Sequence, residues 1–316
     1  MSLFSRSCLI AISCIVLLAA ACSQQKPKPE GPAGPGMEKP QPPGKVVENA
    51  VLKSSLLKKE VRYNVYLPAD YAVSTRSYPV VYLLHGYTDD NTTWVQSGEV
   101  NRYADKAIAE GVIPPMIIVM PNADSSWYVN AYDGQARYED FFIQEFIPSI
   151  EKAYRIRNKK RYRGIAGLSM GGYGSLLYAV RYPDLFDAAA ALSAAVFDDT
   201  TVTGFGDEWY AQAIGPRFGR ALKGKDRLTA SWYNNSVLKL VEAAPAADLR
   251  RVRYYIDCGD KDKLTKGNSL LHLALFNKDV PHEYRVRNGE HSWSYWRTGI
   301  TDALQFIGQD FRDGGF

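Results

Sequence analysis

Short apolar runs that end in turn residues recur along the chain beyond its first 45 residues. Runs of about four to eight apolar residues are typical of strands buried in a parallel sheet. The segment Val61–Pro68 instead alternates apolar and polar residues with the period of two that a strand has. We therefore predict strands at Val61–Pro68, Pro79–Gly86, Met116–Asn122, Tyr162–Gly167 and Asp187–Ser193, with two more at 252–259 and 282–288.

Helical patterns of apolar residues lie between these runs. We predict helices at Val100–Glu110, Tyr138–Tyr154 and Gly171–Tyr182, and two more at 268–278 and 293–309. Strands and helices that alternate at this spacing indicate an α/β fold with a mostly parallel central sheet and helices on both faces. In such sheets the reactive residues lie on loops at the carboxyl ends of the strands.

Composition agrees with one large globular domain. The chain has 316 residues, of which 46% are hydrophobic and 23% charged. Its formal net charge is +4, and three of these charges belong to the first 45 residues, so the remainder is near neutral and lacks the basic footprint of a nucleic-acid-binding protein. Because no His or Cys cluster has ligand spacing, we expect neither a metal nor another cofactor.

The N-terminal region has the layout of an export signal. Residues 1–21 contain a positive charge, an apolar run and then small residues. The run that ends in Cys22 resembles a bacterial lipobox, although an ordinary cleavage site after the same alanines also fits. Residues 22–45 are rich in Pro, Gly and charge, which predicts a linker. We therefore expect a signal peptide of lipoprotein type at 1–21, a linker at 22–45, one folded domain at 46–316, and export to the cell envelope with a lipid anchor at Cys22 as the membrane contact.

The segment Gly167–Gly171 spells GxSxG between a predicted strand and a predicted helix. This strand–turn–helix context is that of a nucleophile elbow, in which glycines permit the close approach of neighbouring backbone. It makes Ser169 the candidate nucleophile. An alternative is that Ser169 only caps the helix that follows.

A serine nucleophile needs a base, and the chain has four histidines. His272 lies in an apolar helical pattern and His282 at the start of an alternating strand, so both fit structural roles better. His85 ends a strand and fits a loop former near the site. His291 lies between the last predicted strand and the last helix, at the same sheet edge as Ser169, and is the predicted base.

The acid should lie between the serine and the histidine in sequence, which is the order found with this elbow. Asp257 lies within a predicted strand, whereas Asp260 and Asp262 lie on the loop that follows. We favour Asp262 over Asp260 as the residue that orients His291 and stabilises the imidazolium.

An oxyanion formed at the attacked carbonyl needs two N–H donors. The N–H of Met170, directly after the nucleophile, is one candidate. The other is the N–H of Tyr87 in the loop after an early strand, where Gly86 lets the backbone turn.

Taken together, these motifs resemble the esterase D family of α/β-hydrolases, which includes feruloyl esterases, short-acyl esterases, S-formylglutathione hydrolases and antigen 85-like mycolyltransferases. The segments that carry the resemblance are "YPVVYLLHGYTDDNTTW", "IAGLSMGGYGSLLYAVRYPDLF", "CGDKD" and "GEHSWSYW". The resemblance implies an α/β-hydrolase catalytic domain at 46–316 and matches Asp262 to the catalytic acid and Tyr87 and Met170 to the oxyanion donors. The segment Phe197–Ser236 does not align with the family pattern, and we expect it to lie over the pocket.

Three functions remain open on this resemblance. The first is a serine esterase that forms an acyl-enzyme and releases it to water. The second is an acyltransferase of the mycolyltransferase type, and the third is a binding module without catalysis on the same fold. For the first, we expect a small-molecule or polysaccharide ester with a short or feruloyl acyl group, and Trp94, Trp127 and Trp293 as substrate-binding residues. These tryptophans could equally be packing residues.

Overall fold

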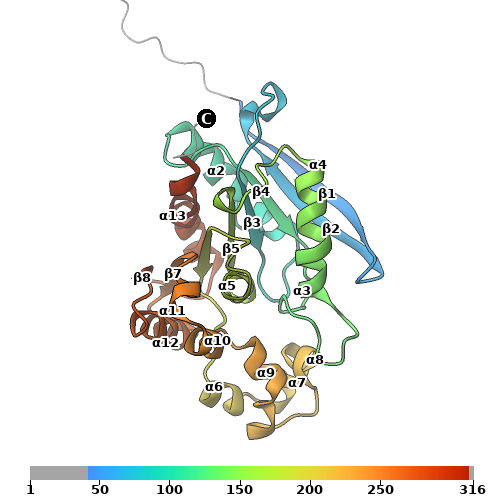
Figure 1. The fold of residues 1–316 in the computed structure, drawn as a ribbon, viewed down its shortest axis with the longest axis vertical. Coiled ribbons are helices and arrows are strands. Elements are labelled where there is room, and N and C mark those ends of the chain that lie inside the picture. The colour runs from blue at the N-terminus through green and yellow to red at the C-terminus, as the bar shows by residue number, and fades with distance from the viewer. Residues whose placement is uncertain (1–41, 313–316) are drawn as a thin grey trace, which may run out of the picture. The chain divides into compact units, whose positions relative to one another are not determined.

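The computed structural model describes residues 42–312, so the predicted signal, Cys22 and most of the predicted linker lie outside the described residues. An eight-stranded sheet forms the centre of the domain, with the order β1-β2-β4-β3-β5-β6-β7-β8 (Figure 1). The strands are β1 (Lys45–Ser54), β2 (Lys59–Leu67), β3 (Val80–Leu84), β4 (Ile117–Pro121), β5 (Arg163–Leu168), β6 (Ala188–Leu192), β7 (Arg253–Gly259) and β8 (His282–Arg287). From β4 through β3 to β8, each strand runs parallel to the next one in this order. Strand β2 runs antiparallel to both of its neighbours, β1 and β4. This is the mostly parallel sheet of an α/β-hydrolase, as predicted.

Helices connect the parallel strands. The longer ones are α2 (Val100–Ala109), α5 (Met170–Arg181), α12 (Thr265–Phe276) and α13 (Trp293–Arg312). The predicted helix at Tyr138–Tyr154 consists of α3 (Tyr138–Phe141), a π-helical turn η2 (Phe142–Phe146) and α4 (Ile147–Ala153). All five predicted helices are therefore present.

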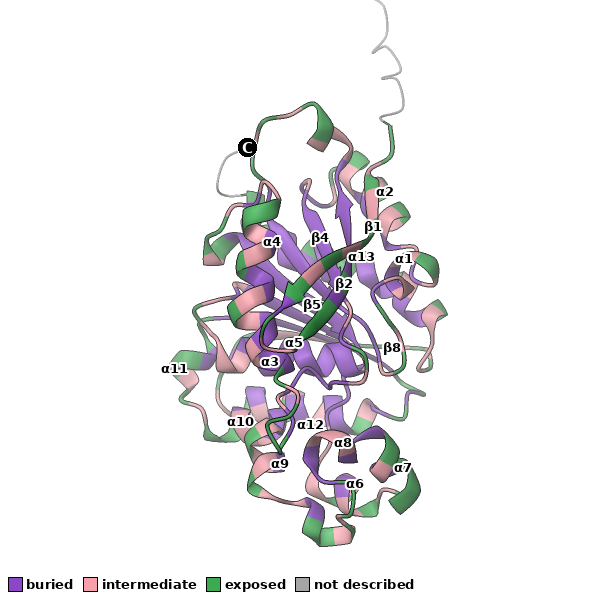
Figure 2. Ribbon diagram, turned by 90° about the vertical axis from the view of Figure 1, so that its right-hand side faces the viewer, coloured by how far each residue is buried: buried purple, intermediate pink, exposed green. Residues whose placement is uncertain are grey.

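Each face of the sheet carries its own hydrophobic core. In β3, Val80, Tyr82 and Leu84 point into one core, while Val81 and Leu83 point into the other, as the strand period of two requires. Helices α3, α4, α5 and α12 cover the first face, and α2 and α13 cover the second. Both faces of the central strands are consequently buried, which Figure 2 shows as purple strands between the helices.

The N-terminal strand β1 was missed by the sequence pattern. It begins at Lys45, the last residue of the predicted linker, and the N–H of Gly44 already donates to Asp105 Oδ1 at 2.8 Å. Several β1 residues are exposed or half-buried, because the strand lies at the sheet edge and pairs only with β2. An edge strand of this kind lacks the continuous apolar run that marks the central strands.

Several short helices gather at one end of the sheet (Figure 1). They are α6 (Asp199–Gly204), α7 (Asp207–Ala213), α8 (Gly215–Phe218), η4 (Gly224–Arg227) and α9 (Ala230–Asn235), followed by α10 (Val237–Ala243) and α11 (Ala246–Leu249). A further short helix, α1 (Thr93–Gln96), precedes α2. The unaligned segment 197–236 thus folds into a helical cover.

Arg227 holds this cover together. Its side chain is fully buried, and its guanidinium donates to the carbonyl oxygens of Val202 at 3.2 Å and Phe205 at 2.7 Å. It also pairs with Asp207 at 2.5 Å. Because a buried guanidinium is stable only with its donors satisfied, these contacts fix the chain between α6 and α7.

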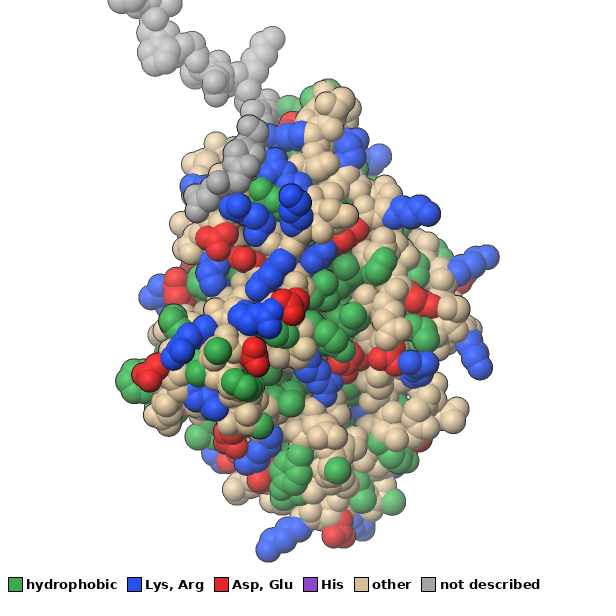
Figure 3. Space-filling model, in the orientation of Figure 1, with side chains coloured by type: hydrophobic (Ala, Val, Ile, Leu, Met, Phe, Trp, Pro, Cys, Tyr) green, Lys and Arg blue, Asp and Glu red, His purple; other side chains and the backbone are tan. Residues whose placement is uncertain are grey.

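The surface carries both signs of charge. On the face drawn in Figure 3, Lys and Arg side chains are interspersed with Asp and Glu, and apolar side chains gather near the middle. Within residues 42–312, none of the helices has the length and apolar character that a membrane span needs.

Candidate active site

Ser169 occupies a sharp turn between β5 and α5. Its φ of 52° is unusual for a residue other than glycine and costs backbone free energy. The two glycines of the motif make the turn possible: a Cβ on Gly167 would lie 2.4 Å from the carbonyl carbon of Gly171, and one on Gly171 would lie 2.3 Å from the oxygen of Leu84. The turn is fixed by hydrogen bonds from Ser169 N–H to Leu192 O and from Ala195 N–H to Ser169 O, both 2.9 Å. The side chain is therefore presented at the end of β5, as in a nucleophile elbow.

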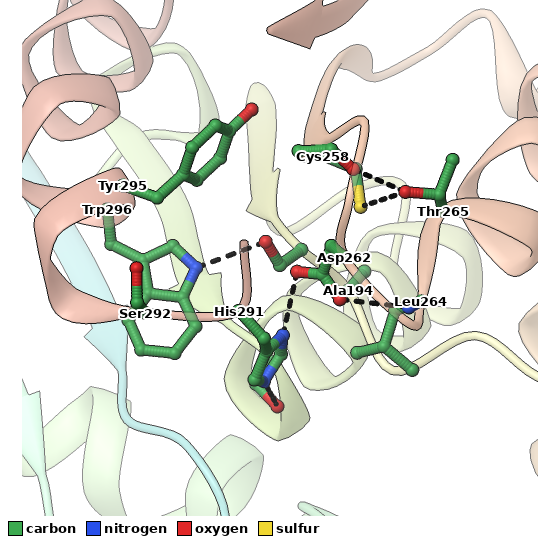
Figure 4. Close-up of polar contacts among 12 residues, drawn as sticks. Ala194, Cys258, Asp262, Leu264, Thr265, His291, Ser292, Tyr295 and Trp296 are labelled. Carbon is green, nitrogen blue, oxygen red and sulfur yellow. Dashed lines mark hydrogen bonds and ion pairs between the residues drawn. The ribbon is translucent and has the colours of Figure 1, made fainter. Parts of the chain in front are cut away.

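His291 and Asp262 complete a hydrogen-bonded chain with this serine (Figure 4). His291 Nε2 lies 3.0 Å from Ser169 Oγ, and His291 Nδ1 lies 2.8 Å from Asp262 Oδ2. When Nδ1 carries the ring proton and donates a hydrogen bond to the carboxylate, Nε2 can accept a hydrogen bond from the serine hydroxyl. The three residues come from the loops after β5, β7 and β8, so the sheet edge brings together positions far apart in sequence.

The Asp262 carboxylate is buried but well supplied with donors. The N–H of Leu264 donates to its Oδ1 at 2.9 Å, and the Ser193 hydroxyl is a further hydrogen-bond partner. Burial raises the pKa of Asp262, but the hydrogen bonds from His291, Leu264 and Ser193 outweigh it and hold the pKa below its ordinary value. The carboxylate is thus ionised when it meets His291.

The other two candidate acids have different contacts. Asp260 is exposed, and its Oδ1 accepts from the N–H of Gly289 at 2.9 Å, which ties the Asp262 loop to the His291 loop. Asp257 is fully buried within β7, where it pairs with Arg287 at 2.5 Å and accepts from Tyr255 at 3.1 Å. Neither carboxylate forms a hydrogen bond or ion pair with His291, so the structure brings only Asp262 to it among these three.

The two candidate oxyanion donors lie beside the serine. Met170 is the first residue of α5, and the first N–H groups of a helix have no intrahelical acceptor. Tyr87 and Ser169 line the same cavity. Both residues are therefore close to Ser169, as two donors to an oxyanion would have to be.

His85 fixes the peptide that carries the Tyr87 N–H. The N–H of Ala123 donates to His85 Nε2 at 2.8 Å, so the ring proton is on Nδ1, which donates to the Gly86 carbonyl at 2.8 Å. In a trans peptide the N–H of Tyr87 points away from that carbonyl. Burial lowers the pKa of His85, and the hydrogen bond to Gly86 offsets this effect only in part. The ring therefore stays neutral in this role.

The two remaining histidines contact each other rather than the serine. His272 Nδ1 lies 2.7 Å from His282 Nε2, and the His272 ring stacks on Tyr284 with 4.5 Å between ring centroids. The contact joins α12 to the edge strand β8. This agrees with the structural roles expected for both.

A cavity of about 490 Å³ opens at Ser169 and His291. One side is an aromatic wall made of Tyr87, Trp127, Phe197, Phe205 and Trp209. Successive rings touch, with centroid separations of 6.1 Å, 6.1 Å, 5.1 Å and 4.7 Å along this order. Lys263, Lys266, Thr201 and several apolar residues complete the lining. The cavity can therefore hold a flat apolar group beside the serine.

Only one of the three predicted substrate-binding tryptophans lines this cavity. Trp127 does, and its indole N–H donates to Ala213 O at 2.8 Å. Trp94 is fully buried and donates to Leu84 O at 2.9 Å, and Trp293 packs edge-on against it at 5.3 Å between centroids. The structure therefore places Trp94 and Trp293 outside this cavity: both belong to an inner cluster with Trp296, whose ring contacts His291.

Trp296 links the inner cluster to the candidate triad. Its ring stands perpendicular to the His291 imidazole at 4.8 Å between centroids, and its N–H donates to Ser193 Oγ at 3.1 Å (Figure 4). Ser193 in turn contacts Asp262. The inner cluster thus contacts His291 directly and Asp262 through Ser193.

Sequence reasoning named few individual residues of the cavity lining, although it expected the segment 197–236 to lie over the pocket, and this segment does supply part of the lining. Phe197, Phe205 and Trp209 belong to the segment that could not be aligned, and Lys263 and Lys266 flank the start of α12. The density of aromatic residues between 197 and 209 was the one available signal.

Comparison with known proteins gives the family. A family model described as "Putative esterase" matches residues 54–307. The chain is 35% identical over 141 residues to an endo-1,4-beta-xylanase/feruloyl esterase of Xylanibacter ruminicola, which is 42% of this chain and 19% of that protein. It is 25% identical over 261 residues to an acetyl esterase of Caldicellulosiruptor saccharolyticus, which is 80% of this chain and 95% of that protein.

A solved structure agrees with this result. A ferulic acid esterase has a TM-score of 0.73 and 35% identity, with 85% of this chain and 99% of that chain covered. The first curated relatives are longer proteins, of which the chain spans between 19% and 28%. The match therefore concerns their esterase-like part.

Proposed function

This chain belongs to the esterase family of α/β-hydrolases and is a carboxylic ester hydrolase, and from that premise we propose that it acts through Ser169, His291 and Asp262. The observation that carries the proposal is the continuous hydrogen-bonded chain from Ser169 Oγ through His291 to the buried Asp262 carboxylate. A helix cap would need no such partner. A binding module without catalysis would need no imidazole held beside the hydroxyl by a buried carboxylate.

The chemistry follows from the positions of these atoms. Ser169 Oγ attacks the ester carbonyl carbon while His291 Nε2 takes the hydroxyl proton. The N–H groups of Met170 and Tyr87 stabilise the oxyanion, and the alcohol leaves with the proton returned by His291. Water then attacks the acyl-enzyme by the same route and releases the acid.

For the substrate, we propose a short or feruloyl acyl group on a carbohydrate or similar polar alcohol. The aromatic wall supplies flat apolar area close to Ser169, and a feruloyl group is a planar ring of matching character. The names of two relatives, a feruloyl esterase and an acetyl esterase, support the same range of acyl groups. We expect kcat/KM to be higher for acetyl and feruloyl esters than for the palmitoyl ester of the same alcohol, and a preference for palmitoyl would contradict this proposal.

The catalytic assignment is tested by labelling and by paired variants. A fluorophosphonate probe should label the wild-type enzyme at one serine and fail to label Ser169→Ala. Asp262→Asn should lower kcat by about four orders of magnitude, because the histidine loses its tautomer and its counter-charge. Asp260→Asn is the matched control and should lower kcat by less than about tenfold, since Asp260 only ties two loops together.

The opposite ranking of Asp260 and Asp262 would refute the acid assignment. Labelling of Ser169→Ala at full yield would place the nucleophile elsewhere. Product analysis with added sugar alcohols separates hydrolysis from acyl transfer: free acid as the main product is expected.

For location, we propose export to the cell envelope with a lipid anchor at Cys22, a residue outside the described part of the chain. The support is the signal-like composition of residues 1–21 and the Pro/Gly-rich stretch after it. Cys22→Ser should shift an active enzyme from the membrane to the soluble fraction. Unchanged fractionation would count against the anchor.

A further inference from the structure

The charges that line the catalytic cavity are of one sign. Among the described residues that line it, Lys263 and Lys266 are the lysines, and none is Asp or Glu. A second cavity, of about 590 Å³ between α6, α10 and α12, differs: it is lined by Asp198, Asp199 and Glu242 as well as by two lysines. The positive lining therefore distinguishes the cavity at Ser169 from this second one.

The two lysines differ in their partners. Lys266 Nζ lies 2.8 Å from Asp198 Oδ2, so an existing carboxylate balances much of its charge. Lys263 is exposed and forms no ion pair with any carboxylate of residues 42–312. Its charge is the one available to a ligand.

The backbone under Lys263 is held firmly. The residue directly follows Asp262, whose N–H donates to Gly259 O at 3.1 Å, and the Leu264 N–H is bound to the Asp262 carboxylate. The side chain therefore starts from a fixed point beside the candidate triad. The positive end of α12, which begins at Thr265, adds a favourable field for an anion on the same side.

The exposed position of Lys263 indicates which part of the substrate it meets. The acyl group must lie inside, against Ser169, whereas the alcohol portion extends toward solvent. At the outer end of the aromatic wall, Trp209 is 45% exposed and offers a face for a sugar ring. A ring and a positive charge are thus available at the opening of the cavity.

We propose that this enzyme selects esters whose alcohol portion carries a carboxylate, as an acidic sugar does, and that Lys263 binds that carboxylate. The inference rests on the proposed function, because it deepens the specificity of the same site. An ammonium group and a carboxylate at an exposed site attract each other modestly, and more strongly where the pair is partly desolvated. The expected preference is therefore several-fold rather than absolute.

The test uses two matched substrates and one neutral reference. The matched pair is an O-acetylated methyl glucuronoside and its primary amide, which share ring and acyl group and differ in charge. We expect kcat/KM to be about five- to tenfold higher for the carboxylate at low ionic strength, with the ratio approaching one at high salt because the charges are screened. The neutral reference, 4-nitrophenyl acetate, reports on the proposed function alone.

Variants assign the effect to a residue. Lys263→Gln should reduce the ratio of carboxylate to amide at least about threefold, mainly through KM, and Lys263→Glu should invert it. Lys261→Gln is the matched control, because Lys261 is an exposed lysine of the same loop that does not line the cavity. It should leave the ratio unchanged.

Each outcome of these measurements either supports or overturns the role of Lys263. A wild-type ratio near one, a ratio that survives Lys263→Gln, or an equal loss in Lys261→Gln overturns this inference while hydrolysis of 4-nitrophenyl acetate leaves the proposed function intact. No hydrolysis of any of the three substrates would instead refute the proposed function. Loss of the ratio in Lys263→Gln alone supports the inference.

Discussion

Two groups of aromatic side chains lie near His291, and they differ in what they contact. The inner cluster of Trp94, Trp293 and Trp296 packs against itself and against the imidazole. The aromatic wall lines the cavity and ends in the exposed Trp209. One group contacts the His291 ring, while the other lines the cavity at Ser169.

The difference follows from the elements that carry the rings. Trp94 lies on α1, and Trp293 and Trp296 lie on the first turn of α13, which packs on a sheet face. The wall residues Phe205 and Trp209 come instead from the short helices and connections of the cover. A tryptophan near the candidate triad therefore lines the cavity only where its element forms the rim of that cavity.

Among substitutions in these two groups, the largest effect should be a loss of stability and should come from Trp94 in the inner cluster. Trp94→Ala should lower the free energy of unfolding by about 3–5 kcal/mol, because it leaves a large cavity and removes the indole N–H that donates to the Leu84 carbonyl. Trp209→Ala on the wall should change it by less than about 0.5 kcal/mol, since that ring is already 45% exposed. Urea unfolding followed by circular dichroism measures the free energy of unfolding of both variants. Equal losses of stability would contradict the distinction between the two groups.

The candidate triad could be predicted because it depends on local signals at strand ends. Ser169 is marked by its glycines, and Asp262 and His291 each follow a recognisable strand. The order of strands along the chain then places all three at one edge of the sheet. Short-range sequence patterns and one topological rule were sufficient for this part of the site.

The cavity lining could not be predicted in the same way. Helices α6 to α9 have only four to seven residues each, too few to show amphipathic periodicity. Tertiary contacts hold them: the buried Arg227 binds the carbonyl oxygens of Val202 and Phe205, and the Trp127 indole reaches Ala213. Lys263 has the appearance of an ordinary solvated lysine in the sequence. Long-range contacts of this kind leave no local pattern.

An intermediate effect is expected where the inner cluster meets the triad. Trp296→Phe keeps a ring against His291 but removes the N–H that donates to Ser193 Oγ. We expect kcat to fall about three- to tenfold, which corresponds to the loss of one hydrogen bond, while KM changes less than about twofold. Both changes should be the same for every ester. Steady-state kinetics on acetyl and feruloyl esters tests this. A change confined to one ester would mean that Trp296 contacts substrate.

The smallest effect should be on selectivity and should come from the wall. Phe205 stands between Phe197 and Trp209, with ring centroids 5.1 Å and 4.7 Å away, so Phe205→Leu keeps most of the volume but breaks the run of aromatic faces. We expect the ratio of kcat/KM for feruloyl over acetyl esters of one alcohol to fall about two- to fivefold, as aromatic contacts contribute roughly 0.5–1.5 kcal/mol beyond their buried area. Trp293→Phe in the inner cluster is the control and should leave this ratio unchanged while lowering stability. If the control shifts the ratio and Phe205→Leu does not, the inner cluster rather than the wall determines acyl selectivity, and the assignment of the two groups is reversed.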